Sequence, residues 1–211
     1  MANEKIVTGP FRLAFPTLFE PRAFTDGGKP KYSVTMLFPK NGESLLPKIG
    51  GPGIKELRKL AMAAVKEKWG EDKAKWPANL RNISFADYVS PNGKDGFPVR
   101  DGDDAEWEGF EGHWYLKASS DNRPGLVDAK VNPILDKAEV FGGLICRAQI
   151  TAFAYDSNGS KGVSFGLSNV QVLKDDGVCY GGGRQKPEDV FDAFGEAGAT
   201  GSSSSDDDDN W

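Results

Sequence analysis

The stretch Leu144–Tyr155 holds the side chains whose types and spacing are best suited to chemistry. Because side chains alternate across a β-strand, small apolar residues fall on one face, and Arg147, Gln149, Phe153 and Tyr155 fall on the other. A guanidinium can bind phosphate and aromatic rings can stack on bases, which are the contacts that a single-stranded nucleic acid needs. We therefore interpret this face as a nucleic-acid contact surface. The alternative is that the two rings cover a hydrophobic patch beneath a loop.

A second expected strand, His113–Ser119, supplies further candidates. Its alternation buries Trp114 and Leu116 and leaves Tyr115 and Lys117 on the opposite face. The predicted nucleic-acid contacts are Arg147 and Lys117 for phosphates, Lys31, Arg81 and Arg123 to extend the phosphate path, and Tyr115, Phe153 and Tyr155 for base stacking.

Residues suited to catalysis or metal binding do not form a recognisable motif. The one histidine, His113, has no nucleophile or acid at motif spacing, and the two cysteines lack the spacing of zinc ligands. The segment Asp101–Glu111 is crowded with carboxylates, but Ala105 and Glu106 stand where a calcium loop needs an oxygen ligand and a glycine. We expect no catalytic residue, no metal and no cofactor, with a metal-dependent nuclease site in this segment as the less favoured alternative.

The elements that must position the candidate contacts are mainly short strands. The first strand is expected at a sheet edge, because its region contains Pro10, Pro16 and Pro21. Apolar residues at helical spacing predict an amphipathic helix over Ile54–Trp69, ended by Gly70. The pattern fits a mainly β, OB-fold-like barrel with this helix inserted, and a split β-sandwich is the rival. The expected strands are Phe11–Phe15, Lys31–Phe38, Ile83–Val89, His113–Ser119, Leu126–Val131, and a long hairpin of Leu144–Tyr155 and Gly162–Val172 with a bulge near its end.

Charge is distributed unevenly along the chain. Eight acidic residues against one lysine from Lys186 onward give −7, which leaves +2 on residues 1–185 of a chain whose net charge is −5. The chain ends in four serines, Asp206, Asp207, Asp208, Asp209, Asn210 and Trp211. We predict a folded domain over 1–185 and a disordered acidic C-terminal tail over 186–211, whose carboxylates and terminal ring suit a basic, partly apolar pocket. A merely solubilising tail is the alternative.

Three stretches of the chain resemble a family of tailed-phage single-stranded DNA-binding proteins: Lys29–Val34, Tyr155–Gly159 and Gly162–Val170. The similarity runs over most of residues 1–185, and the acidic tail with its terminal aromatic is similar to those of phage and bacterial single-strand binders. The resemblance implies an OB fold, sequence-independent protection of single strands in DNA replication or recombination, and a tail that recruits replication proteins. Asn210 is a difference, since many bacterial tails have a proline there and a terminal phenylalanine.

We therefore expect a non-catalytic protein whose partners are single-stranded DNA and, through Asp206–Asp209 and Trp211, replication and recombination proteins. A phage structural or interaction protein with a solubilising tail is the alternative. No leader and no apolar stretch of membrane-spanning length is evident, so we expect a location in the host cytoplasm and no membrane partner. The sequence leaves the oligomeric state open, with a homo-oligomer among the options.

Overall fold

The computed structural model describes residues 4–23, 27–91, 93–157 and 159–180. The predicted tail, including Asp206–Asp209 and Trp211, lies outside these described residues. Of the described helices, none is long and apolar enough to cross a membrane. The strands are β1 (Ile6–Val7), β2 (Phe11–Arg22), β3 (Lys31–Pro39), β4 (Arg100–Asp101), β5 (His113–Ser120), β6 (Gly125–Val127), β7 (Ile145–Ser157) and β8 (Ser160–Lys174), and the helical segments are α1 (Ile54–Trp69), η1 (Lys73–Lys75), α2 (Ala78–Arg81) and η2 (Lys137–Glu139).

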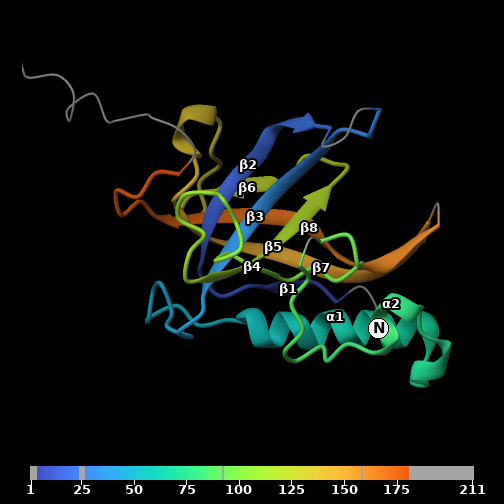
Figure 1. Cartoon of the computed structure of the whole chain (residues 1–211). Helices are drawn as coiled ribbons and strands as arrows, with labels where there is room; N and C mark the ends of the chain where they lie inside the picture. Colours follow the sequence, from blue (N-terminus) through green and yellow to red (C-terminus); the bar gives the residue numbers. More distant parts are fainter. Residues whose placement is uncertain (1–3, 24–26, 92, 158, 181–211) are drawn as a thin grey trace, which may run out of the picture. The chain divides into compact units, whose positions relative to one another are not determined.

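Five strands close into a ring (Figure 1). The pairs run from β2 to β3, β5, β8 and β7, and β7 returns to β2. Every pair in the ring is antiparallel except β5 with β8, which is parallel. A five-stranded ring of this kind is the arrangement of an OB fold, so the predicted mainly β, OB-fold-like barrel is confirmed.

The inner face of the ring forms the hydrophobic core. On β3 the side chains of Val34 and Met36 are fully buried, and on β5 Leu116 and Ala118 follow. Phe165 on β8 fills the same interior. Burial of each large apolar side chain stabilises the fold by about 1.5–3 kcal/mol. Because alternate residues of a strand point to opposite faces, the residues between these core positions lie on the outside of the ring.

The long hairpin of β7 and β8 is confirmed, together with its predicted bulge. Gln149 pairs with Asn169, whereas the next residue, Ile150, pairs with Leu167. Ser168 is therefore an extra residue on β8. Such a bulge bends and twists a strand, which helps the hairpin to follow the curvature of the ring.

Strand β2 is longer than the predicted Phe11–Phe15 and is not an edge strand throughout. Its start pairs with β7 on one side and with β3 on the other. From Thr17 onward, its pairs within the described residues are with β3 alone, and Pro16 and Pro21 fall in the intervals where the register shifts. The edge prediction is therefore right for the proline-containing part and wrong for the start of the strand, since proline is tolerated at bulges and unpaired sides.

The predicted strand Ile83–Val89 is wrong. The chain turns there instead, with the Tyr88 N–H donating to the Ser84 carbonyl at 2.7 Å. Phe85 and its neighbours face the core from this turn, so their apolar character reflects burial and not strand alternation. The predicted strand Leu126–Val131 shortens to β6, because the chain turns at Asp128, whose carboxylate accepts backbone N–H groups from beyond it.

Helix α1 spans the predicted residues, 54–69, and packs against β7 and β8. It lies along one end of the strands in Figure 1. The Gly53 N–H donates to the Glu56 carboxylate at 3.2 Å at the start of the helix. At the other end, the Gly70 N–H donates to the Lys66 carbonyl at 2.6 Å, and Gly70 has φ +86°, which glycine adopts readily.

Two polar side chains fix the segment between α2 and β4. Arg58, buried on α1, donates to the Tyr88 carbonyl at 2.5 Å, and its guanidinium lies 5.8 Å from the centroid of the Phe97 ring. The Asp95 carboxylate accepts the Tyr88 hydroxyl at 2.6 Å and the Ser90 hydroxyl at 2.7 Å. Burial acts to raise the pKa of Asp95, but the hydrogen bonds outweigh it and hold the pKa below its usual value. This segment is therefore a defined wall beside the ring.

Gly96 sets how closely this wall approaches β8. It has φ +80°, and a Cβ there would lie 2.3 Å from the Lys161 carbonyl oxygen. We expect Gly96→Ala to lower the free energy of unfolding by about 2–4 kcal/mol, through left-handed strain plus the clash. Gly112→Ala is the control, since Gly112 has φ +72° with open space around it, and should cost only about 1–2 kcal/mol. Chemical denaturation measures both, and equal losses would mean that the close contact is unimportant.

Candidate nucleic-acid interface

A hollow of about 860 Å³ opens on the outer face of β3 and β5. In an OB fold, the middle strands and the loops that frame them form the ligand face. The hollow lies there: the end of β2, the wall at residues 93–98 and the hairpin of β7 and β8 all contribute to its lining. We call this hollow the groove and define it by Phe15, Arg22, Arg100, Trp107, Lys117 and Tyr155.

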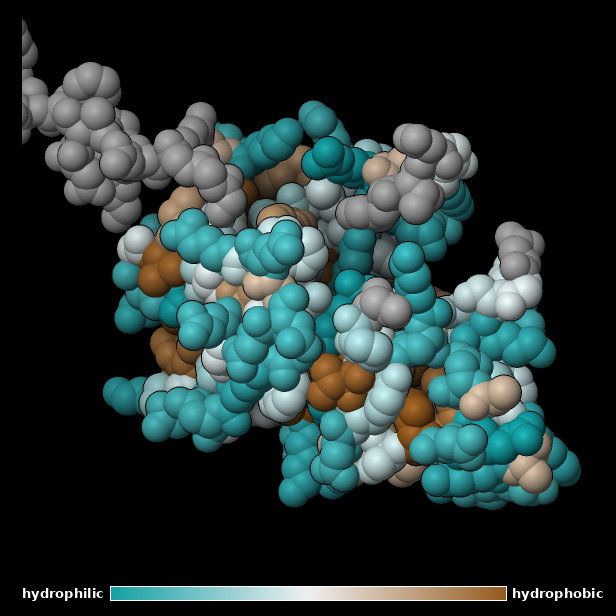
Figure 2. Space-filling model, in the orientation of Figure 1, coloured by the Kyte–Doolittle hydropathy of each residue, from teal (hydrophilic) through white to brown (hydrophobic). Residues whose placement is uncertain are grey.

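The floor of the groove consists mostly of small hydroxyl side chains. Ser33 pairs with Ser119 and Thr35 pairs with Lys117 across β3 and β5. Thr17 on β2 extends this row, with its hydroxyl 2.9 Å from that of Ser33. Small uncharged groups leave room for a polymer backbone to approach the sheet. This face of the molecule is mostly hydrophilic, with its apolar residues in small separate patches (Figure 2).

Among the described residues, the charged side chains that line the groove are all basic: Arg22, Arg100 and Lys117. In the described part of the chain, no ion pair neutralises Arg22 or Arg100. Lys117 keeps an exposed surface, yet protein atoms crowd around it at the bottom of the groove. This poor solvation, with the nearby charge of Arg100, lowers the pKa of Lys117 to about 8. The groove is therefore a concentrated positive site in a chain whose net charge is −5.

Two exposed aromatic rings stand at one end of the groove. Phe15 and Trp107 are 45% and 49% exposed, and their ring centroids lie 5.2 Å apart. Phe110 and Tyr115 pack beneath them, each within about 6.3 Å of the Trp107 centroid. Phe15 has φ +46°, an uncommon conformation for a bulky residue, and such strain concentrates at functional sites. The pair is a fixed platform of the kind on which bases stack.

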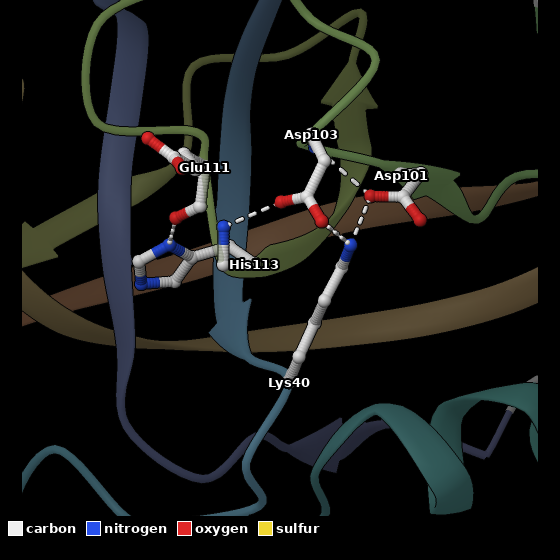
Figure 3. Close-up of polar contacts among 6 residues, drawn as sticks. Lys40, Asp101, Asp103, Glu111 and His113 are labelled. Atoms are coloured by element: carbon white, nitrogen blue, oxygen red, sulfur yellow. Dashed lines mark hydrogen bonds and ion pairs between the residues drawn. The ribbon is translucent and has the colours of Figure 1, made fainter.

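Lys40 fastens the acidic segment that carries Trp107 to the barrel (Figure 3). Its ammonium donates to Asp101 and, at 2.5 Å, to Asp103, which also accepts the Gly112 N–H at 2.6 Å. Burial opposes the charge of Lys40, but these bonds outweigh it and raise the pKa of Lys40, while Lys40 holds the pKa of Asp103 below its usual range. Among the described residues, no group of three or more His, Cys, Asp or Glu side chains could hold a metal ion.

Three of the eight predicted contacts line the groove: Tyr115, Lys117 and Tyr155. Lys117 lies on the floor, and Tyr155 lies toward the tip of the hairpin. Tyr115 is only 9% exposed, with its ring 5.0 Å from that of Phe110. Tyr115 therefore supports the exposed rings more than it offers a surface of its own.

Three predicted cations lie outside the groove lining. The Lys31 ammonium lies 3.5 Å from the Asp121 carboxylate. The Arg123 guanidinium lies 5.3 Å from the centroid of the Phe19 ring. Arg81 lines a different hollow, beside α2. The structure does not bring these three cations together with Lys117.

The two remaining predicted contacts, Arg147 and Phe153, share a face of β7 but not a site. The Arg147 Nε donates to the Gln171 amide oxygen at 2.7 Å, near the pairing with β6. Phe153 is 40% exposed and pairs with Ser164, which lines the groove. Strand β7 bends around the ring, so two residues on the same face of the strand can lie at different sites: Arg147 lies near β6, and Phe153 lies beside the groove. Alternation in the sequence shows which face a residue is on but does not show this bend.

Sequence reasoning missed four residues of the groove: Phe15, Arg22, Arg100 and Trp107. The signal for Phe15 was a strand interrupted directly by Pro16. The sequence signal for Trp107 is a large aromatic ring inside an otherwise acidic segment. Neither arginine belongs to a recognisable motif, since both come from strand ends that only the folded ring brings to this face.

Small side chains on the floor, basic side chains and exposed rings form a combination that suits a single-stranded nucleic acid, because cations can hold its backbone and rings can stack on its bases. A family model described as "Enterobacter phage Enc34, ssDNA-binding protein" matches residues 4–207. Protein p50 of Acyrthosiphon pisum secondary endosymbiont phage 1 is 34% identical over 189 residues, which cover 89% of this chain and 93% of p50. The chain belongs to this family of phage single-stranded DNA-binding proteins, which are not enzymes.

Solved structures share the fold. The single-stranded DNA-binding protein of bacteriophage Enc34, in complex with ssDNA, aligns with a TM-score of 0.60 and 22% identity over 84% of this chain and 89% of that one. The single-stranded DNA-binding protein gp2.5 of bacteriophage T7 aligns with a TM-score of 0.53 and 13% identity over 94% and 100% of the two chains. The predicted phage family and its fold are confirmed.

The groove makes Lys117 an unusual lysine, which can be measured directly. We expect NMR titration of its side chain to give a pKa of about 8, below the ordinary value of 10.5. Arg100→Gln should raise this pKa by removing a positive neighbour, but not to 10.5, because the crowding remains. A pKa of 10.5 in the unaltered protein would contradict the poor solvation of this ammonium.

Proposed function

We propose that the groove binds single-stranded DNA without sequence preference and so protects and organises single strands during phage DNA replication and recombination, in the host cytoplasm. The observation that carries this proposal is the lining of the groove, which contains Arg22, Arg100 and Lys117 and, among the described residues, no carboxylate. In a chain with an excess of acidic residues, such a distribution favours a polyanion at this one face.

The remaining groups of the groove suit a single strand better than a duplex. The exposed Phe15 and Trp107 rings offer stacking surfaces, which only unpaired bases can use. The floor offers hydroxyl groups of small side chains and few long polar side chains that could read the edges of bases. We therefore propose contacts to phosphates and base faces, which every sequence presents equally.

Salt-dependent binding tests this proposal. We expect a labelled oligo(dT) of about thirty nucleotides, longer than the roughly 4–16 that one OB fold covers, to bind saturably in fluorescence anisotropy and to outcompete matched duplex. Arg100→Ala should lower the slope of log affinity against log salt by about 0.7, the share of one phosphate contact. Lys59→Ala removes the same charge from an exposed position on α1 and should leave the slope unchanged. Absence of salt-sensitive binding would contradict the proposal and favour a structural role.

The aromatic platform makes a separate prediction. Trp107→Ala should weaken binding by about 1–3 kcal/mol, roughly 5- to 150-fold in the dissociation constant, while Trp107→Phe should restore most of the loss. Phe153→Ala tests the ring predicted from the sequence. If only Phe153→Ala lowers the affinity for DNA, the stacking site lies on the hairpin and not at the end of the groove.

The acidic tail is proposed to recruit replication proteins and to compete with DNA for the groove. Its carboxylates, Asp206–Asp209, are opposite in charge to the groove cations, and Trp211 provides an apolar end. Deletion of residues 202–211 should tighten binding to oligo(dT) at low salt, and the difference should shrink as salt screens the charges. A tail of equal length with serine in place of the four aspartates is the control for length. Unchanged affinity after the deletion would count against competition.

A further inference from the structure

A second hollow, of about 520 Å³, lies beside α2 and the hairpin of β7 and β8. In the part of its lining that the structure describes, the charged residues are all basic: Lys75, Arg81, Lys94 and Lys161. Trp69, at the end of α1, contributes a partly exposed ring. We call this site the basic hollow. Its composition repeats that of the groove, with cations, an aromatic ring and no carboxylate in the described lining.

A thin wall separates the basic hollow from the groove. Gly93 and Gly96 line the groove, whereas Lys94, between them in sequence, lines the basic hollow. On the hairpin, Tyr155 lines the groove and pairs with Gly162. The residue before Gly162 is Lys161, which lines the basic hollow. The two sites are therefore neighbours across one layer of backbone.

The side chain of Asn79 holds this wall in place. Its amide donates to the Asp95 carbonyl at 2.6 Å and to the Lys161 carbonyl at 2.9 Å. It thereby ties α2, the wall and β8 together. Asp156 pairs with Lys161 at 2.9 Å, so one lining charge is compensated at the rim while the lining as a whole stays basic.

We infer that the basic hollow is a second contact site for the same DNA strand, where phosphates of nucleotides leaving the groove meet Lys75, Arg81 and Lys94, with the Trp69 ring as a base surface. This inference rests on the proposed function, because the strand reaches the hollow from the groove. A DNA strand is favoured over an acidic protein segment as the ligand of the basic hollow, because the two basic sites adjoin. A strand that leaves the groove therefore lies beside the basic hollow.

Oligonucleotide length separates the two sites. The double variant Lys75→Ala, Lys94→Ala should weaken binding of oligo(dT) of about thirty nucleotides about tenfold at low salt and lower its salt slope by about 1.4, while binding of a six-nucleotide oligo(dT) stays unchanged. The matched control is Lys55→Ala, Lys59→Ala, on the exposed face of α1 and about 15–20 Å along the helix from Trp69. The control should leave both affinities unchanged.

Other outcomes would overturn the inference in distinguishable ways. If the double variant binds both oligonucleotides normally while Arg100→Ala weakens both, the second site is absent and the proposed function stands. Equal weakening at both lengths would mean that the hollow acts only through general charge. If a labelled tetra-aspartate peptide binds and loses affinity in the double variant while DNA binding is unaffected, the hollow is a protein-docking site. If the unaltered protein binds neither oligonucleotide, the proposed function fails as well.

Discussion

Closure of the five-stranded ring, at the β2–β7 and β5–β8 pairs, is the constraint on which the rest of the structure depends. A small closed barrel has an interior that side chains must fill, so alternate residues of every strand are apolar. On β3 this requirement places Val34 and Met36 inside, and the same alternation places Ser33 and Thr35 outside. The core and the groove floor thus lie on opposite faces of the same strands. A shift in the pairing register of β3 would displace the residues of both faces together.

Hydrogen bonds and ion pairs hold the segments around the ring in place, so that they form walls around the polar outer face of the sheet. Arg58 and Asp95 hold one wall, and Lys40 holds the segment that carries Trp107. A binding site whose walls are ordered beforehand does not lose that ordering entropy when a ligand arrives. The carboxylates of Asp101 and Asp103 anchor this segment by binding Lys40, which explains how an acidic stretch can border a basic groove.

The sequence predicted the elements that are governed by local patterns. Helix α1 has the predicted bounds because its apolar spacing is regular and Gly70 ends it, and the β7–β8 hairpin follows from long alternation around a turn. The groove was only partly predictable, because its members come from strands and loops far apart in sequence. Lys117 was found from its own strand, whereas Arg100 and Trp107 reach the groove only through pairing with β5 and through the anchor at Lys40. Arg147 was predicted for the same site as Phe153 because the two residues alternate onto one face of β7. The strand bends around the barrel, so the two residues lie apart.

The order of strands in the ring also has a consequence for how the protein is made. Strand β2 leaves the ribosome early, yet its partner β7 and the hairpin strand β8 come last among the strands. Strand β3 follows β2 directly and can pair with it at once, but at about 5–20 residues per second β7 is reached only about 6–25 s after β2. Pairing between such distant segments is slow, and an unpaired strand edge invites association with other chains in the meantime. The groove is therefore complete only after β7 and β8 have been synthesised, because these two strands close the ring around it.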